Sequence, residues 1–415
     1  MGNTQGSAAA PTLAALAALT LAGLLTGCGL VAEQNPPSAS ALPGAVPAAQ
    51  SPTTAPAPSP MPTPGAGPDC PALRCASILV TGDMLVHAQL WKQAGDDAAA
   101  AGTSGLDFGP LLEGQRSYIR HSDLAICHQE TAVAGPDGPF SAYPSFNVPP
   151  QIITASKNVG YQACTTASNH TIDRNTDGLL RTLDALDAVG LKHTGSYRTE
   201  AESQGILIMQ TKAAKIAVIE GTYGLNGQTA EYAWQVDMLD APAMIAKAAK
   251  ARALGADIVL GAMHAGEEYA SVPNAQQQEV AHALVDSGQF SMIYGHHTHS
   301  VLPIEKYKDT WIVYGLGNGV TELSPWYVVN NEGLLVRVQF SQDAAGQWSA
   351  SDLAWAPSVM VRDPYRWCSV ASDAPQGVCA TPEADAATRQ RTAAVVESLG
   401  SAAAGAHELL ITREP

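Results

Sequence analysis

The sequence predicts an α/β fold with a candidate functional site at the carboxyl ends of its strands. Apolar runs typical of strands alternate with segments of helical periodicity from residue 76 to about residue 340. Polar clusters follow five of the apolar runs. One cluster, Gly295-His296-His297-Thr298-His299, comes directly after the run 290–294 and contains the tripeptide His297-Thr298-His299. Residues two apart in an extended chain share a face. Such alternation indicates helices packed on sheets, with sites where strands end.

The apolar runs predict the strands. They cover residues 77–81, 124–127, 161–166, 205–210, 215–220, 258–263, 291–294, 311–314 and 334–340. The runs at 205–210 and 215–220 are separated by a short turn, so we expect them to form a pair. Most of the other runs are separated by helical segments, which is the pattern of parallel strands joined by crossover helices.

Helical spacing of apolar residues predicts helices at 110–121, 149–158, 175–189, 241–254 and 273–286. Segment 175–189 places its leucines on one face and stops at Gly190, a common residue just past a helix end. Segment 241–254 follows Asp240, a good capping residue, has Pro242 in its first turn and ends at Gly255.

The first residues are typical of an exported lipoprotein. Residues 1–27 predict a signal peptide, because the apolar stretch 13–27 is too short to span a bilayer. The stretch leads into Leu25-Thr26-Gly27-Cys28, which resembles a bacterial lipobox. We therefore expect a membrane anchor through lipid on Cys28, on the outer face of the bacterial cytoplasmic membrane. The first twelve residues contain no Lys or Arg, unlike the start of a typical signal peptide.

Composition divides the rest of the chain. Residues 28–75 are rich in Pro and Ala, offer little to bury and predict a tether. Residues 76–362 carry the alternating pattern and predict the main domain. Residues 363–415 predict an irregular C-terminal appendage with a cysteine pair and an Ala-rich helix over about 382–399.

Six cysteines besides Cys28 form an even set, which suits an oxidising compartment. Cys70 with Cys75, and Cys368 with Cys379, are the local pairings we favour. Cys127 and Cys164 lie on predicted strands, where they could bridge neighbouring strands or stay buried thiols. No pair has C-x-x-C spacing, so a thiolate zinc site is not expected.

The net charge of −16, from 38 acidic and 22 basic residues, opposes an anionic partner. No run of Lys and Arg occurs, which argues against nucleic acid as a partner. Arg174 is one of few basic residues near the polar clusters and a candidate contact for an anionic substrate.

The five polar clusters hold the residue types that divalent transition metals prefer. They are Gly82-Asp83, His128-Gln129-Glu130, Ser168-Asn169-His170 with Asp173, His264 with Glu267 and Glu268, and His297-Thr298-His299. Imidazoles and carboxylates converging from several strands form such sites, and a pair of ions needs a carboxylate that bridges them. The sequence therefore predicts a metal site at this edge of the sheet.

At these residues the sequence resembles the CapA family, named for capsule and poly-γ-glutamate biosynthesis, within the calcineurin-like metallophosphoesterase superfamily. The matching segments are 81–85, 123–130, 167–173 with Gly178, 264–269, 295–305 and 314–318. The resemblance covers roughly residues 76–337. It implies a four-layer αββα sandwich of two mixed sheets with metals at the strand ends.

The resemblance also implies roles for the clustered residues. Asp83 and His299 would hold one ion, Asn169, His264 and His297 a second, and Glu130 would bridge them. His170 would act as general acid near the leaving group, with Asp173 orienting it. One or two ions of manganese, iron or zinc would activate a water molecule as the nucleophile.

Several positions depart from the family pattern. His128 stands where the family commonly has Asn in Asn-Leu-Glu, and could be a further ligand. Leu85 stands where the superfamily often has His, so the first metal site could be weak or empty. Glu268 matches an acidic family residue and could contact the metal shell or substrate, or be a solvated loop carboxylate. Ala265, Thr298 and Gly319 replace a usual Trp, Pro and Phe.

Three functions follow from the resemblance as hypotheses. The first is a metal-dependent hydrolase of an amide in a capsule or poly-γ-glutamate-type envelope polymer or its precursor. The second is a phosphoesterase acting on an envelope precursor. The third is a non-catalytic subunit that binds polymer synthase or export proteins. The ligands suit both hydrolytic reactions, because each uses activated water and a general acid.

Overall fold

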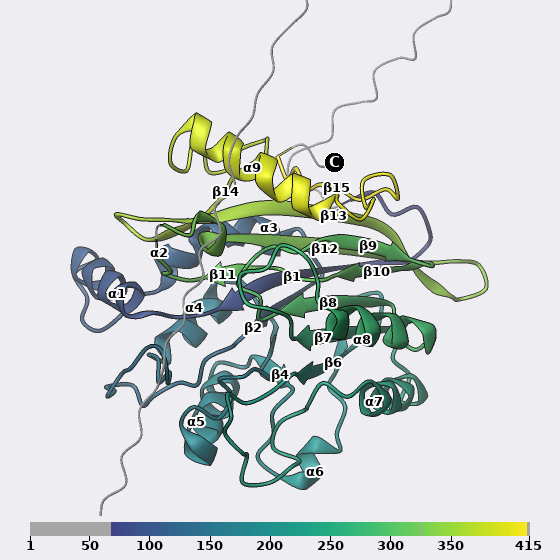
Figure 1. The fold of residues 1–415 in the computed structure, drawn as a ribbon, viewed down its shortest axis with the longest axis horizontal. Helices are drawn as coiled ribbons and strands as arrows, with labels where there is room; N and C mark the ends of the chain where they lie inside the picture. The colour runs from purple at the N-terminus through teal and green to yellow at the C-terminus, as the bar shows by residue number, and fades with distance from the viewer. Residues whose placement is uncertain (1–67, 325, 413–415) are drawn as a thin grey trace, which may run out of the picture. The chain divides into compact units, whose positions relative to one another are not determined.

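Two mixed β-sheets form the centre of the fold in the computed structural model, which describes residues 68–324 and 326–412 (Figure 1). The expected signal peptide, Cys28 and most of the expected tether lie outside the described residues. Among the described residues, no helix is long and apolar enough to cross a bilayer.

The first sheet has nine strands in the order β14-β13-β12-β1-β2-β3-β4, with β11 beside β1 and β15 beside β13. Their bounds are β1 (Cys75–Met84), β2 (Leu124–His128), β3 (Ala163–Thr165), β4 (Lys192–Thr194), β11 (Asn318–Val320), β12 (Glu332–Gln342), β13 (Trp348–Val361), β14 (Arg366–Ser369) and β15 (His407–Glu408). Strands β1 to β4 are parallel to one another. Their carboxyl ends therefore lie along one edge.

The second sheet has six strands in the order β5-β6-β7-β8-β10-β9. Their bounds are β5 (Ile208–Gln210), β6 (Lys215–Thr222), β7 (Ile258–His264), β8 (Met292–His296), β9 (Ile304–Tyr307) and β10 (Thr310–Val313). Strands β6, β7, β8 and β10 are parallel. Strand β5 pairs antiparallel with β6, as the turn between their runs predicts.

Three apolar clusters fill the spaces between four layers. Side chains alternate along β1, so that Ile78 and Val80 face the second sheet while Leu79 faces the opposite way. The outer face of the first sheet packs against α1 (Ala88–Ala100), α4 (Gln151–Val159) and α5 (Asn175–Ala188). The outer face of the second sheet packs against α7 (Ala241–Ala253) and α8 (Ala275–Asp286). The four-layer sandwich is confirmed.

Helix ends follow the local signals. The Asp240 side chain accepts a hydrogen bond from the Ala243 N–H at 2.8 Å and caps α7 as predicted. Helix α8 begins later than expected, because Asn274 and Gln277 form a reciprocal capping box. Gly190 and Gly255, just past α5 and α7, have φ of 72° and 89°, which suits glycine.

The single helix expected at 110–121 is wrong. The segment folds as α2 (Gly109–Leu112), the 3-10 turn η1 (Glu113–Gln115) and α3 (Arg116–Arg120). Gly114 packs so closely that a Cβ would lie 2.6 Å from the carbonyl oxygen of Trp367 in β14. A strand distant in sequence therefore shapes this break.

Residues 363–415, expected as an appendage, contribute to the first sheet. Strand β14 pairs antiparallel with β13, and β15 pairs parallel with it. Helix α9 (Pro382–Val396) packs Val396 into the apolar cluster between the sheets, and Figure 1 shows α9 above β12 and β13. Short elements α6 (Glu200–Ser203) and η2 (Val328–Asn331) complete the described helices.

All three cysteine pairs form disulfides. Cys70–Cys75 and Cys368–Cys379 confirm the favoured local pairings. Cys127 and Cys164 are register partners on the parallel strands β2 and β3, and they too are bonded. Both strands lead directly into the predicted site.

We expect the double replacement Cys127→Ala/Cys164→Ala to lower the free energy of unfolding by about 3 kcal/mol, because the bond closes a loop between residues 37 apart. Denaturant titration of the purified protein measures the change. The same pair of substitutions at Cys70 and Cys75, which are 5 apart, should cost less. Equal losses in the two variants would contradict the loop-length argument.

Candidate metal centre

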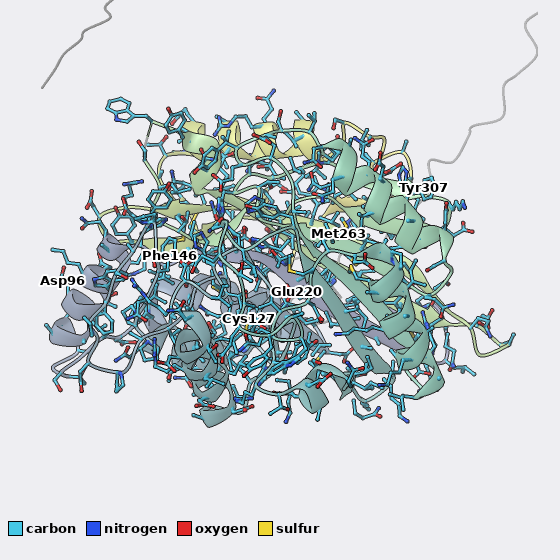
Figure 2. The ribbon with its side chains drawn as sticks, turned by 60° about the horizontal axis from the view of Figure 1, so that its bottom comes forward. Asp96, Cys127, Phe146, Glu220, Met263 and Tyr307 are labelled. Atoms are coloured by element: carbon cyan, nitrogen blue, oxygen red, sulfur yellow. A yellow bond between two sulfur atoms is a disulfide. The ribbon has the colours of Figure 1, made fainter. Side chains whose placement is uncertain are left out.

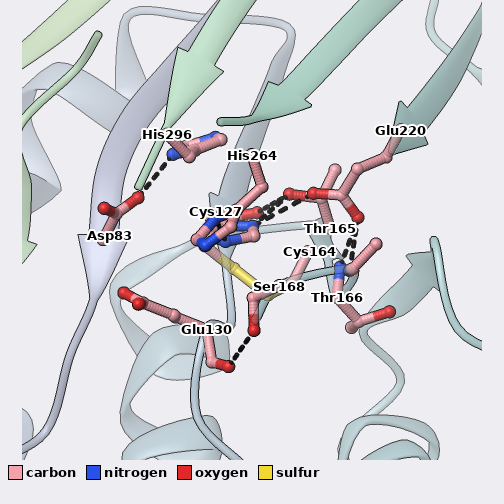
Figure 3. A network of polar contacts seen from close by, with 12 residues as sticks. Asp83, Cys127, Glu130, Cys164, Thr165, Thr166, Ser168, Glu220, His264 and His296 are labelled. Carbon is pink, nitrogen blue, oxygen red and sulfur yellow. Dashed lines mark hydrogen bonds and ion pairs between the residues drawn. A yellow bond between two sulfur atoms is a disulfide. The ribbon is translucent and has the colours of Figure 1, made fainter. Parts of the chain in front are cut away.

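Five of the parallel strands bring the predicted residues to one place. Asp83 stands near the end of β1 and is the register partner of His128, which ends β2. His264 ends β7 and is the register partner of His296, which ends β8. Because the two sheets stack face to face, their carboxyl ends meet, and Figure 3 shows side chains from both sheets around one centre.

Asp83 connects the two sheets. Its Oδ1 lies 2.7 Å from Nδ1 of His296, and its Oδ2 accepts a hydrogen bond from the His297 backbone N–H at 3.1 Å. His299 Nδ1 lies 3.3 Å from the same Oδ2. Burial disfavours the Asp83 carboxylate, but the hydrogen bonds from His296 and His299 outweigh it and hold its pKa well below the ordinary value.

Glu130 is completely buried, and neither of its carboxylate oxygens has a hydrogen-bond partner among the described residues. Its Oε1 lies 3.7 Å from Nε2 of His299. Burial raises the pKa of Glu130 to about 7. Burial opposes protonation of His299, but the charge of Glu130 and the contact with Asp83 raise its pKa to about 9. A buried carboxylate without a hydrogen bond is costly unless a cation binds it.

The expected ligands of the second ion also converge. His264 Nε2 lies 2.8 Å from Oδ1 of Asn169. The His297 ring lies near that of His264, with 4.9 Å between ring centroids and the planes tilted by 49°. Burial and the neighbouring His299 lower the pKa of His297 to about 3, and burial and His128 hold that of His264 well below its ordinary value. Both imidazoles are therefore neutral at pH 7, the form that binds metal.

His170 and Asp173 form a pair beside this group. His170 Nδ1 lies 2.7 Å from Oδ2 of Asp173, which also accepts the Phe146 backbone N–H at 2.7 Å. Phe146, labelled in Figure 2, packs edge-on against the His170 ring with 4.7 Å between centroids. Asp173 and Phe146 together restrain the imidazole orientation.

The three additional candidates occupy different surroundings. His128 is completely buried and lies within the group, with Nε2 2.9 Å from Nδ1 of His264. Glu268 is exposed, yet a carboxylate oxygen comes within 4.8 Å of ring nitrogens of His297 and His299. Arg174 is half-buried and donates to the Ser145 carbonyl at 2.7 Å, so part of its guanidinium is already engaged.

Two residues at the centre were not predicted. His296 stands beside the H-x-H tripeptide, and the stacking of the two sheets, which brings it against Asp83, could not be read from the sequence. Glu220 is 1% exposed and contacts His128, with 3.1 Å between its Oε1 and Nδ1. The sequence signal for Glu220 was its place at the end of an apolar run, and a glutamate at such a place is usually exposed to solvent.

The residues present fit divalent metal ions. Two overlapping sets of His, Asp and Glu place ligand atoms within 4.8 Å of one another: Asp83 with Glu130 and His299, and Asp83 with His128 and His264. Both oxygens of Glu130 and Nδ1 of His297 are buried without a hydrogen-bond partner among the described residues. Unsatisfied acceptors of this kind, gathered in one buried place, are suited to transition-metal cations.

A family model described as "Bacterial capsule synthesis protein PGA_cap" matches residues 77–322, more than half of the chain. The chain belongs to this capsule synthesis family. Similar relatives are the capsule biosynthesis protein CapA of Bacillus anthracis, 28% identical over 41% of this chain and 42% of the relative, and the PGA biosynthesis protein CapA of Bacillus subtilis, 28% identical over 48% and 52%. The chain thus spans about half the length of these family members.

Two further comparisons extend this list. A protein of Mycobacterium tuberculosis named "Probable polyglutamine synthesis accessory protein" is 25% identical over 48% of this chain and 56% of its own length. Among solved structures, the calcineurin-like phosphoesterase YfkN of Bacillus subtilis aligns with a TM-score of 0.45 and 16% identity over 77% of this chain and 96% of its own. The family match covers all six expected ligands, from Asp83 to His299.

Proposed function

We propose that this capsule synthesis family member is a metal-dependent hydrolase acting on an amide bond of a poly-γ-glutamate-type or capsule polymer, or of its precursor. The observation that carries the proposal is Glu130, whose buried carboxylate has no hydrogen-bond partner among the described residues. Its ligand atom lies within 4.8 Å of those of Asp83 and His299, and Asp83 also belongs to the set with His128 and His264. A bridging cation ligand explains why such a carboxylate is retained.

Six residues would hold the ions. As the family resemblance implies, Asp83, Glu130 and His299 would form one set and Asn169, His264 and His297 the other, with Glu130 contributing to both. When bound, divalent manganese, iron or zinc ions supply Lewis-acid chemistry that activates water and polarises the bond to be cleaved. The protein contributes a buried, preorganised set of donors.

His170 would serve the leaving group. Its Nδ1 is held by Asp173 at 2.7 Å, which leaves Nε2 available to deliver a proton to the departing amine. Asp173 is itself held by the Phe146 N–H, so the acid keeps one orientation. The residues that would hold the ions are therefore different from the residue that would move a proton.

A phosphoesterase reaction would use the same ligands and is the alternative chemistry. Cationic groups favour an anionic substrate, whereas the charges of Glu267 and Glu268 act on Tyr223, whose ring centroid lies 4.4 Å from that of His297. Arg174 is engaged with the Ser145 carbonyl. Poly-γ-glutamate also carries a free carboxylate on each residue, so these charges oppose both substrates, and the match to the capsule synthesis family is what favours the amide.

A non-catalytic role is the second candidate, because one relative is named as an accessory protein of polymer synthesis. In that role the domain would bind the polymer, a synthase or an export subunit. We place either activity at the outer face of the cytoplasmic membrane, held there by lipid on Cys28. The sequence features of residues 1–28 support this location.

Elemental analysis of the purified protein, prepared without chelator, tests the metal centre. About two transition-metal ions per chain are expected, with fewer in His297→Ala. The loaded protein is then incubated with poly-γ-glutamate and, separately, with a chromogenic phosphodiester. Shortening of the polymer supports the amide hydrolase, and cleavage of the phosphodiester alone supports the alternative chemistry. Absence of metal in both proteins would overturn the hydrolase proposal in favour of the accessory role.

A further inference from the structure

Glu220 lies behind the expected ligands and contacts two elements that carry them. Its Oε2 accepts hydrogen bonds from the backbone N–H groups of Thr166 and Ala167, at 2.8 and 2.6 Å. Its Oε1 lies 3.1 Å from Nδ1 of His128. Figure 3 shows Glu220, from β6, on the same side of the centre as His264, Thr165 and Thr166.

A chain of contacts runs from Glu220 to the expected metal ligands. His128 Nε2 lies 2.9 Å from Nδ1 of His264, and His264 Nε2 lies 2.8 Å from Oδ1 of Asn169. The Asn169 amide is oriented by its Nδ2, which donates to Oδ1 of Asn226 at 3.1 Å. Glu220, His128 and His264 are each 1% exposed or less, so water does not compete for these contacts.

The carboxylate determines which nitrogens carry protons. Nδ1 of His128 faces two oxygens, Oε1 of Glu220 at 3.1 Å and Oγ1 of Thr165 at 2.9 Å. An ionised carboxylate only accepts, so its closeness favours a proton on Nδ1. Cations bound nearby disfavour a charged imidazole, so beside them His128 is neutral. Its Nε2 is then an acceptor, and Nδ1 of His264 donates to it. Nε2 of His264 keeps its lone pair and faces the Asn169 oxygen. Two acceptors this close repel each other unless a cation neutralises them.

We infer that Glu220 is a positioning residue for the metal centre, acting through His128 to keep the lone pair of His264 Nε2 available to the ion. The inference rests on the metal site proposed above. It gives His128, which stands where the family commonly has Asn, a place as the link between a buried carboxylate and a ligand. Carboxylates behind a ligating histidine commonly fix its tautomer and orientation.

Replacing Glu220 with glutamine should move the proton of His128, and that of His264, to the other ring nitrogen. The side-chain oxygen of glutamine can still accept from Thr166 and Ala167, while its NH₂ group then faces Nδ1 of His128. The Thr165 hydroxyl, 2.9 Å away, can turn to donate to the same nitrogen. Nδ1 then becomes an acceptor, so His128 donates from Nε2 and His264 carries its proton on Nε2. The ligand lone pair is lost although the shape of the side chain is kept.

We expect Glu220→Gln to weaken Mn²⁺ binding by about 10- to 100-fold, as measured by isothermal titration of the metal-free protein. The matched control is Glu305→Gln, which removes a second glutamate that contacts a histidine outside the site. Glu305 accepts the Tyr314 hydroxyl at 2.7 Å and lies 3.0 Å from Nε2 of His282. Its replacement should leave the Mn²⁺ affinity unchanged.

A double-variant cycle separates positioning from simple support of the fold. In a His128→Asn background the link to His264 is absent, so Glu220→Gln should cause no further loss of Mn²⁺ affinity. An equal loss in both backgrounds would show that Glu220 acts through the 166–167 backbone, and unchanged affinity in the single variant would also overturn the inference. If Glu220→Gln fails to fold, His128→Asn alone is the test. A loss of Mn²⁺ affinity in that variant supports the inference, and an unchanged affinity overturns the inference.

The possible results separate failure of this inference from failure of the proposed metal-dependent function. A wild-type protein that binds no Mn²⁺, Fe²⁺ or Zn²⁺ removes the metal centre and the positioning role together. If the wild-type protein binds the ion no more tightly than Glu220→Gln does, only the positioning role is overturned.

Discussion

Replacing Glu130 with glutamine is expected to lower Mn²⁺ affinity at least about 100-fold, because the variant removes a ligand shared by both ion sites. Glutamine keeps the volume of the side chain, so the surrounding packing is preserved. The same change should leave the metal-free protein as stable as the wild type or more stable, because it removes a buried carboxylate without a hydrogen-bond partner among the described residues. Titration calorimetry and thermal unfolding in chelator measure the two effects.

Glu332→Gln is the control for a buried glutamate with another task. Glu332 is 3% exposed and is paired with Arg391 and Thr388 of α9. Its replacement should lower the melting temperature and leave metal affinity unchanged, the reverse of the pattern for Glu130→Gln. If Glu130→Gln binds Mn²⁺ as tightly as the wild type, Glu130 is not a ligand.

Replacing His170 with alanine is expected to reduce polymer hydrolysis about 100- to 10,000-fold while metal content stays at the wild-type value. The reason is that His170 belongs to neither of the ligand groups built around Asp83, and its Nδ1 is already held by Asp173. Elemental analysis and the poly-γ-glutamate assay, run on the same preparation, measure both quantities.

Asp173→Asn is a less clean test, because Asp173 also accepts the Phe146 N–H, and its loss disturbs the loop as well as the imidazole. Full hydrolysis by His170→Ala would exclude His170 as the general acid. If the wild-type protein supports polymer synthesis but hydrolyses no polymer, and His170→Ala supports synthesis equally well, the accessory role is favoured.

Local sequence signals placed most of the elements that carry the site. Apolar runs found the strand that carries Asp83 near its end and the strands that end at His128, His264 and His296, because burial of parallel strands on both faces leaves continuous apolar segments. The resemblance to the capsule synthesis family then named ligands from separate clusters. The structure brings Asp83, Glu130 and His299 into one group as expected, and His264 into contact with Asn169.

Other elements could not be found locally. Strand β13 begins with polar residues such as Ser349, Ser351 and Asp352, and forms by pairing along β12. The break at Gly114 reflects the closeness of Trp367, more than 250 residues away in the chain. Both features depend on partners that are distant in sequence, which periodicity does not report.

The sequence by itself determined the α/β class, the disulfides within the first and last cysteine pairs, and the residue types at the strand ends. These properties depend on neighbours within a few residues or on one apolar face. Only the tertiary structure decided that Cys127 bonds Cys164, that His296 contacts Asp83, and that Glu220 stands behind His128. Each of these contacts is set by strand register and by the stacking of the two sheets, because parallel strands meet only after long crossover connections.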